Sequence, residues 1–312
     1  MSLRVRRSTN ESSLSQSARD AVREALERMG CAQIKWKNGA VHFETGGEKI
    51  QLSDTLLPDW IRTIEPPVQT DLVAIALSEV TGLQLPRSIA SDLSLVQSKL
   101  YPMAVTRDAF SGPDRAMCRR EVGTDLYAAI WIGIGGKGLW LTSAELDRWP
   151  IDFEEAFSVA CANMGTTIST GTVNEISDGH GVLAALAEGV DLCGGLLCLG
   201  TFLPDDFTPG SHGVLACSPT PGTILLLPVR PGGGAEGIAS IVQISDMLRD
   251  DRVASEAQKR LYWAQPTTEP GVLGYTLDML PVITIHEGNS RRAHVDSSEE
   301  VQSLLRVLGE ID

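Results

Sequence analysis

The chain has 312 residues, of which 43% are hydrophobic and 21% charged, and its 26 Lys and Arg against 40 Asp and Glu give a net charge of −14. A chain of this length buries roughly 75% of the surface that its unfolded form exposes, so it needs no disulfide or metal to hold a core. This composition excludes a disordered, collagen-like or coiled-coil protein. No apolar run approaches the roughly 20 residues of a membrane helix, so we expect a protein that does not enter the membrane.

The acidic residues are unevenly distributed along the chain. Residues 157–312 carry 8 basic and 19 acidic side chains, a net charge of −11. A surface of this sign repels phosphate backbones, which predicts that the protein does not bind nucleic acid. The same field attracts a basic protein partner.

The cysteines and the first residues of the chain indicate the cellular compartment that we expect. Six cysteines are too few for a disulfide scaffold in a chain this long. The basic start, Met1 to Arg7, is followed by the polar segment Ser8 to Asp20 instead of the apolar stretch of an export signal. We therefore expect a cytoplasmic protein whose thiols are mainly core residues.

The first hundred residues predict a helix and a small strand meander. Apolar residues at spacings of three and four predict a helix from Ser13 to Met29. Asn38-Gly39 favours a tight hairpin turn between two of the strands. The predicted strands are 31–37, 40–44 and 49–52, and further helices are predicted at 57–64, 71–83 and 91–100. Pro66-Pro67 indicates a linker.

The middle of the chain predicts a sheet followed by helices. Strands are expected at 101–107, 117–122, 125–134 and 138–141, with a turn at Gly135-Gly136-Lys137. Thr142 or Ser143 can cap a helix that runs to Trp149. A second helix is expected from Asp152 to Met164, followed by a long loop over Gly165 to Gly181 that is rich in Gly, Ser and Thr.

The last hundred residues alternate hairpins with helices. Strands are predicted at 212–218, 223–229, 261–264, 273–277 and 282–286, and helices at 236–248 and from Ser297 or Ser298 to Leu308. Strands outnumber long helices and are mostly joined as hairpins. The pattern predicts an α+β fold, with mixed or antiparallel sheets, flanking helices and a small N-terminal helix-and-strand appendage.

From Lys99 onward the order of motifs resembles the YtpQ-like family of bacterial proteins of unknown function. The resemblance rests on Leu100-Tyr101-Pro102-Met103-Ala104-Val105, Asp125-Leu126-Tyr127, Leu141-Thr142-Ser143-Ala144-Glu145-Leu146, Phe157 to Asn163, Gly213 to Pro219 and Arg260-Leu261-Tyr262-Trp263. It implies a fold and a bacterial origin but no catalytic residue. Together with the proline linker it predicts an N-terminal appendage over residues 1–98 and a main domain over 99–312.

Glycine and cysteine motifs predict neither a cofactor nor a metal. Gly133, Gly135 and Gly138 match G-x-G-x-x-G, but a strand follows them where a nucleotide site needs a helix. A second match, over residues 232–237, is interrupted by Pro228 and Pro231 and carries the charge of Glu236, which opposes phosphate. Cys193 and Cys198 lie in an apolar stretch that favours a core role over zinc binding.

Two functions remain open from the sequence. The first is a non-enzymatic interaction protein, such as an immunity, adaptor or chaperone-like protein, that binds a basic protein partner through Asp246, Asp250 and Asp251. The alternative is a hydrolase or transferase whose site lies under the 165–181 loop, with His180 as general base beside Asp178. The loop motivates the alternative because long connections in compact domains often serve as lids or binding loops.

Overall fold

A computed structural model describes the chain with a set of gaps. The gaps are residues 1–13, 63–69, 82, 84–85, 111–115, 124, 135–136, 170–172, 177–180, 188–190, 203–211, 233–235, 250–253, 256, 268–274, 281, 288–289, 296–297 and 311–312. The contacts divide the chain into two compact units, Met1–Val96 with Gly133–Leu139, and Gln97–Ile132 with Trp140–Asp312. Helices and antiparallel sheets in both units confirm the α+β class.

The first unit contains the predicted helix and meander. Its elements are α1 (Gln16–Arg28), β1 (Ala32–Lys37), β2 (Ala40–Thr45), β3 (Glu48–Ser53), α2 (Asp59–Arg62), α3 (Thr70–Thr81), α4 (Arg87–Ala90) and α5 (Leu93–Val96), with a 3-10 turn, η1, at Asp54–Leu56. The β1–β2 turn holds Asn38 at φ 53° and Gly39 at φ 71°, the left-handed conformations that an Asn-Gly hairpin turn requires. The predicted linker at Pro66-Pro67 lies outside the described residues.

Among the described strands, β1, β2 and β3 pair only with one another. The sheet of the first unit is therefore separate from the sheets of the second. Whether the predicted segments 1–98 and 99–312 fold independently stays a prediction for limited proteolysis.

The second unit begins with a four-stranded sheet and the helices that follow it. Its elements are η2 (Gln97–Lys99), β4 (Leu100–Thr106), η3 (Arg107–Phe110), β5 (Arg119–Gly123), β6 (Leu126–Ile134), α6 (Ser143–Leu146) and α7 (Phe153–Ser169). The fourth strand is β7 (Lys137–Trp140), of which residues 137–139 are grouped with the first unit. β6 pairs with β4 on one side and with β5 and β7 on the other. The predicted cap of α6 is Thr142, whose backbone N–H donates to Glu145, but α6 ends at Leu146 and not at Trp149.

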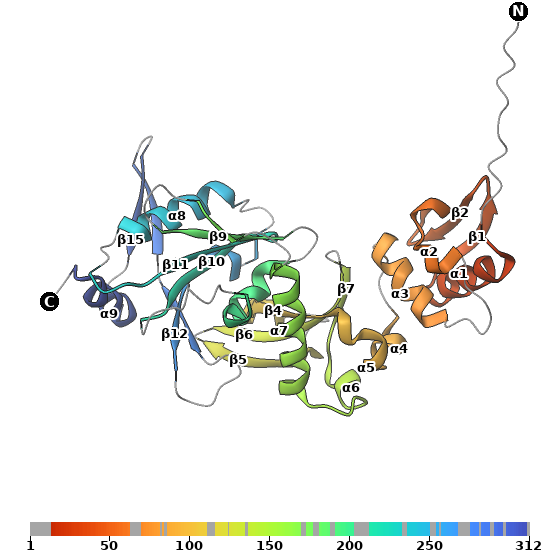
Figure 1. Cartoon of the computed structure of the whole chain (residues 1–312), viewed down its shortest axis with the longest axis horizontal. Coiled ribbons are helices and arrows are strands. Elements are labelled where there is room, and N and C mark those ends of the chain that lie inside the picture. Colours follow the sequence, from red (N-terminus) through yellow and green to blue (C-terminus); the bar gives the residue numbers. More distant parts are fainter. Residues whose placement is uncertain are drawn as a thin grey trace, which may run out of the picture. The chain divides into compact units, whose positions relative to one another are not determined.

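α7 covers one face of this sheet (Figure 1). Its buried residues are the adjacent Ala156 and Phe157 and, at spacings of three or four from them and from one another, Ala160, Met164 and Ile168. They pack with alternate residues of the strands, since Leu100 and Ala104 of β4 and Leu126, Ala128, Ile130 and Ile132 of β6 are all buried.

The long loop predicted over residues 165–181 is wrong in its first part. α7 continues through Gly165 to Ser169, and β8 (Val173–Glu175) follows. The hydroxyls of Thr166 and Thr167 donate to the carbonyls four residues earlier, so these residues remain in the helix. Gly165 serves close packing, because a Cβ at this position would lie 2.7 Å from the hydroxyl oxygen of Thr201.

The rest of the second unit forms a six-stranded antiparallel sheet in the order β13-β12-β10-β11-β9-β8. Its further elements are β9 (Leu183–Leu186), β10 (Val214–Thr220), β11 (Thr223–Pro228), α8 (Glu236–Leu248), β12 (Leu261–Pro266), β13 (Tyr275–Leu280) and α9 (Glu299–Leu308), with 3-10 turns η5 (Leu192–Leu197), η6 (Leu199–Thr201) and η8 (Ala257–Lys259). α8 and α9 pack with one face of the sheet around Leu215, Trp263 and Leu304. A separate hairpin pairs β14 (Val282–Glu287) with β15 (Ser290–Val295).

The buried turn η5 connects the two sheets of this unit. A Cβ on Gly194 would lie 1.7 Å from the carbonyl oxygen of Pro102 in β4, and one on Gly195 would lie 2.2 Å from Ile224 in β11. The hydroxyl of Tyr275 donates to the carbonyl of Leu196 at 2.8 Å. η5 therefore fills the space between the sheets with backbone where side chains would not fit.

Candidate functional site

The second face of the four-stranded sheet, opposite α7, carries half-buried aromatic side chains. Strand alternation and the register place Tyr101 beside Trp131, Met103 beside Ala129, and Val105 beside Tyr127. We call this surface the outer face. It consists of Tyr101, Met103, Val105, Arg119, Glu121, Tyr127, Ala129, Trp131 and Trp140, with Phe110 of η3 packed against it. Its four Tyr and Trp side chains are half-buried.

Two edge-to-face ring pairs organise the aromatic residues. The rings of Trp131 and Trp140 lie with centroids 4.8 Å apart at 77°, and those of Phe110 and Tyr127 lie 4.7 Å apart at 78°. The guanidinium of Arg119 lies 4.1 Å from the centroid of the Phe110 ring. These contacts hold the rings in fixed orientations, so that little side-chain entropy is lost when a ligand binds to them.

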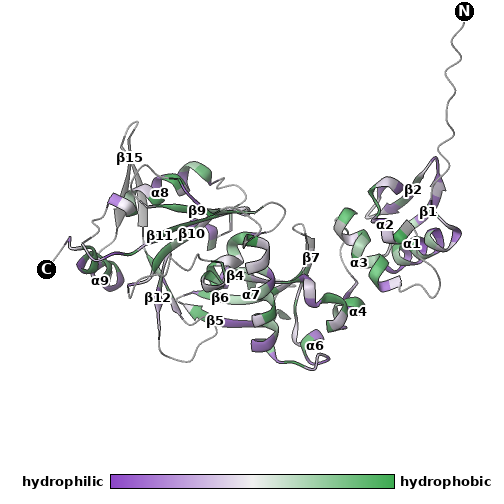
Figure 2. Cartoon of the chain, in the orientation of Figure 1, coloured by the Kyte–Doolittle hydropathy of each residue, from purple (hydrophilic) through white to green (hydrophobic). Residues whose placement is uncertain are grey.

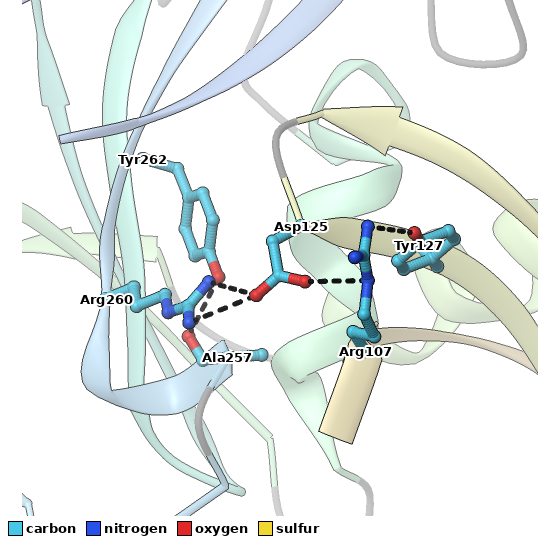
Figure 3. A network of polar contacts seen from close by, with 6 residues as sticks. All are labelled: Arg107, Asp125, Tyr127, Ala257, Arg260 and Tyr262. Atoms are coloured by element: carbon cyan, nitrogen blue, oxygen red, sulfur yellow. Dashed lines mark hydrogen bonds and ion pairs between the residues drawn. The ribbon is translucent and has the colours of Figure 1, made fainter. Parts of the chain in front are cut away.

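One end of the outer face is a charged network around Asp125. Figure 3 shows its carboxylate between two guanidinium groups. Oδ2 lies 3.4 Å from both Nη1 and Nη2 of Arg260, and Oδ1 lies 3.7 Å from Nε of Arg107. Arg107 also donates to the hydroxyl of Tyr127 at 3.3 Å. The network thus connects the start of β12 with β6, the strand that carries Tyr127 and Trp131.

The local backbone positions Asp125 for this role. Its φ of 55° is left-handed, a conformation that Asp tolerates better than most residues because of its short polar side chain. The side chain of Arg107 is 73% exposed, and that of Asp125 is 34% exposed. The hydroxyl of Tyr127, followed by the charge of Asp125, raises the pKa of Arg107 and keeps its guanidinium charged.

Charged groups of both signs lie on and beside the outer face. The arginines are Arg107, Arg119 and Arg260, and the carboxylates are Glu121 and Asp125. Figure 2 shows β5, which carries Arg119 and Glu121, as a largely hydrophilic strand beside the more apolar β6.

The residues predicted for catalysis, Asp178 and His180, lie outside the described residues. Their roles therefore stay predictions, although the helix up to Ser169 shortens the loop that motivated them.

Of the three carboxylates predicted to bind a partner, the structure describes Asp246. Its side chain is 9% exposed and lies 3.0 Å from a guanidinium nitrogen of Arg249, which directly follows the end of α8. This carboxylate offers little surface to a partner. Asp250 and Asp251 lie outside the described residues, and the binding role of the three stays a prediction.

Cys193 and Cys198, predicted as core residues, are buried, as are Cys31 and Cys217, whereas Cys118 and Cys161 are half-buried. Burial raises the pKa of Cys193 and Cys198 well above the ordinary 9.0, so both remain protonated at neutral pH. Within the described part of the chain, no three His, Cys, Asp or Glu side chains are grouped to hold a metal ion. The hairpin predicted around Gly133 and Gly138 is confirmed by the pairing of β6 with β7.

Comparison of the chain with family models, curated proteins and solved structures gave no match. The resemblance to the YtpQ-like family therefore stays a prediction. No helix in the described ranges combines the length and apolar character needed to cross a membrane.

Sequence reasoning missed the outer face because it predicted a strand over residues 125–134 without distinguishing the two faces of that strand. The signal was present in the alternation of Tyr127 and Trp131 with the fully buried Leu126, Ile130 and Ile132. Two half-buried aromatic residues four positions apart on one face differ from the continuous aliphatic run of a strand that is buried on both faces.

Proposed function

We propose that this protein is a non-enzymatic interaction module that binds a protein partner through the outer face. The observation that carries the proposal is the composition of that face. Tyr, Trp, Met and Arg are the residue types enriched in protein interfaces, and Trp, Tyr and Arg dominate their binding energy. Here Tyr101, Tyr127, Trp131, Met103 and Arg119 lie on three adjacent strands.

Rigidity of the face supports the same conclusion. The ring pair Trp131–Trp140 and the stacked Arg119 lie on paired strands, with α7 packed behind the sheet. A surface that is ordered before binding loses less conformational entropy when it meets its partner. This arrangement suits a preformed docking surface.

Site-directed photocrosslinking tests the proposal. Benzoylphenylalanine is placed at Tyr101, on the outer face, and in a matched variant at Met247, a 63% exposed residue of α8. After irradiation in an extract of the organism that encodes the chain, we expect a discrete protein adduct from position 101 and none from position 247. Equal labelling at both positions, or no adduct at either, contradicts the proposal.

A further inference from the structure

We infer that Cys161 of α7 and Cys198, which directly follows η5, are a redox-active pair that a hydroperoxide oxidises to an intrachain disulfide. Both thiols are free in this structure. The pair is separate from the outer face, and the inference does not depend on the proposed function.

The two thiols lie next to each other in the fold, where α7 packs against η5 and η6. The Sγ of Cys161 donates to the carbonyl oxygen of Leu197 at 3.9 Å, and Leu197 is bonded directly to Cys198. The side chains of Cys161 and Cys198 are also hydrogen-bonded to each other. A disulfide forms without backbone movement where the Cα atoms lie within about 7 Å and the side chains point toward each other. The contacts of Cys161 fit this requirement.

The other cysteines of the chain have different neighbours. Their side chains are hydrogen-bonded to hydroxyls or to a backbone carbonyl: Cys31 to Thr45, Cys118 to Ser143, Cys193 to the carbonyl of Ala104, and Cys217 to Ser245. Among the hydrogen bonds described for the six cysteines, only the contact between Cys161 and Cys198 joins two thiols. Oxidation is therefore expected to select this pair.

Burial assigns a different role to each thiol. Cys161 is half-buried, whereas Cys198 is 4% exposed. Burial, together with the hydrogen bond to Cys161, raises the pKa of Cys198 well above 9.0, so this thiol does not itself react with a peroxide, which attacks thiolates. Cys161 is the group that meets the oxidant, and Cys198 is the thiol that completes the disulfide.

The reaction has two steps. The Cys161 thiolate attacks one oxygen of hydrogen peroxide, so that an S–O bond forms, the O–O bond breaks, and the released hydroxide takes up the proton that Cys161 has lost. The sulfur of Cys198 then attacks the sulfenic acid, so that the S–S bond forms, the S–O bond breaks, and the leaving hydroxide becomes water with the Cys198 proton. Two thiols are oxidised, one peroxide is reduced and two water molecules form.

Contact between the thiols makes the second step intramolecular, which offsets the small thiolate fraction of Cys198. The disulfide joins α7 to η5 and closes the loop of chain between them. Closing this loop lowers the entropy of the unfolded chain, so the oxidised protein is more stable than the reduced one. We expect oxidation to raise the melting temperature by about 5 °C.

Peroxide treatment of the purified full-length chain tests the inference. The remaining thiols are then alkylated with N-ethylmaleimide in denaturant, and the chain is digested without reduction and mapped by mass spectrometry. We expect a peptide pair linked through Cys161 and Cys198, with the other cysteines alkylated. Treatment with dithiothreitol is expected to remove the link and to reverse the rise in melting temperature.

Cys161→Ser is expected to abolish both the linked peptide and the rise in melting temperature. Cys193→Ser is the matched control, because this buried thiol belongs to η5 but donates to the carbonyl of Ala104. It is expected to form the disulfide like the wild type. Circular dichroism of the reduced variants establishes that they are folded.

The peptide map of the wild type decides the inference even if a variant does not fold. A wild-type chain whose cysteines all stay reduced overturns it, as does one in which Cys161 accumulates as sulfinic acid without a linked peptide. A disulfide between other cysteines, or a Cys161→Ser chain whose melting temperature still rises on oxidation, also overturns it.

Discussion

Among the described glycines, an added Cβ would meet its nearest neighbour at the shortest distance at Gly194. η5 passes so close to β4 that a Cβ at this position would lie 1.7 Å from the carbonyl oxygen of Pro102. Backbone atoms on both sides prevent a side chain from moving aside, so the strain must be taken up by shifts of η5 or β4.

We therefore predict that Gly194→Ala lowers the free energy of unfolding by about 3 kcal/mol, at the upper end for overpacking. Gly200→Ala is the matched control, because nothing lies within 4 Å of a Cβ there, and its effect is expected within about 0.5 kcal/mol. Urea denaturation measures both. A Gly194→Ala chain as stable as the Gly200→Ala chain would show that η5 does not pack tightly against β4.

Asp191 makes stability depend on pH. Burial raises the pKa of this carboxyl above its ordinary 3.8, although the backbone N–H of Cys193 donates to it and lowers the pKa in part. In the window between 3.8 and the raised value, the folded chain binds more protons than the unfolded chain, so stability falls as pH rises. At pH values above the pKa of Asp191 in the folded chain, the loss of stability is complete and no longer changes with pH.

Asp191→Asn removes this loss, since the amide oxygen can still accept from Cys193 and carries no charge. The variant is expected to melt at a higher temperature than the wild type at pH 7, and the difference is expected to vanish as pH falls below about 3.8. Melting temperatures of the variant and the wild type, measured by thermal unfolding from pH 7 to below pH 3.8, test the direction of this difference. A variant that is less stable at pH 7 would contradict the account.

At the scale of elements, the local sequence pattern predicts the start and the buried face of α7 but not its end. Its start at Phe153 and its buried face follow from apolar spacing. Its end was misplaced at Met164, because Gly165, Thr166 and Thr167 are typical of loops. Only the tertiary structure shows that Gly165 admits Thr201 and that the two threonine hydroxyls bond within the helix.

Asn163 connects α7 with the sheet. Its amide nitrogen donates to the carbonyls of Gln97 at 2.8 Å and of Leu100 at 3.0 Å. Asn163→Asp keeps the shape but replaces the donor with an acceptor, which faces two carbonyl oxygens. We expect a loss of about 2 kcal/mol in the free energy of unfolding.

Thr166→Ala serves as the control for this change, because Thr166 is exposed and its hydroxyl donates to the carbonyl of Ala162 in the same helix. Its expected effect is within about 0.5 kcal/mol. Equal effects of the two changes in chemical denaturation would refute the role of Asn163 as a link between α7 and β4.

At the scale of the whole molecule, the α+β class, the meander, the β10–β11 hairpin and the helices α8 and α9 follow from local sequence. Asn38-Gly39 and the N-cap Ser298 are signals that act within a few residues. The order of the six-stranded sheet does not follow, since β11 pairs with β9 and β10 with β12 across long connections. Such pairing depends on packing that single segments do not encode.

The candidate site, like the fold, has features that local sequence predicts and features that depend on contacts between distant residues. Alternation in residues 126–131 indicates two different strand faces, but it cannot show that α7 covers one of them while the other stays half-exposed. The network of Arg107, Asp125 and Arg260 joins residues up to 153 positions apart in the chain. No spacing rule brings these three together.

Hydroxyl-radical footprinting of the assembled protein tests the central claim most directly. Met103 on the outer face and Met247 on α8 carry the same oxidisable group. Their oxidation rates are compared between the free chain and the complex of the chain with its protein partner. Binding through the outer face predicts slower oxidation of Met103, together with Tyr101 and Trp131, and an unchanged rate at Met247. Protection of Met247 with no change at Met103, Tyr101 and Trp131 would contradict the account.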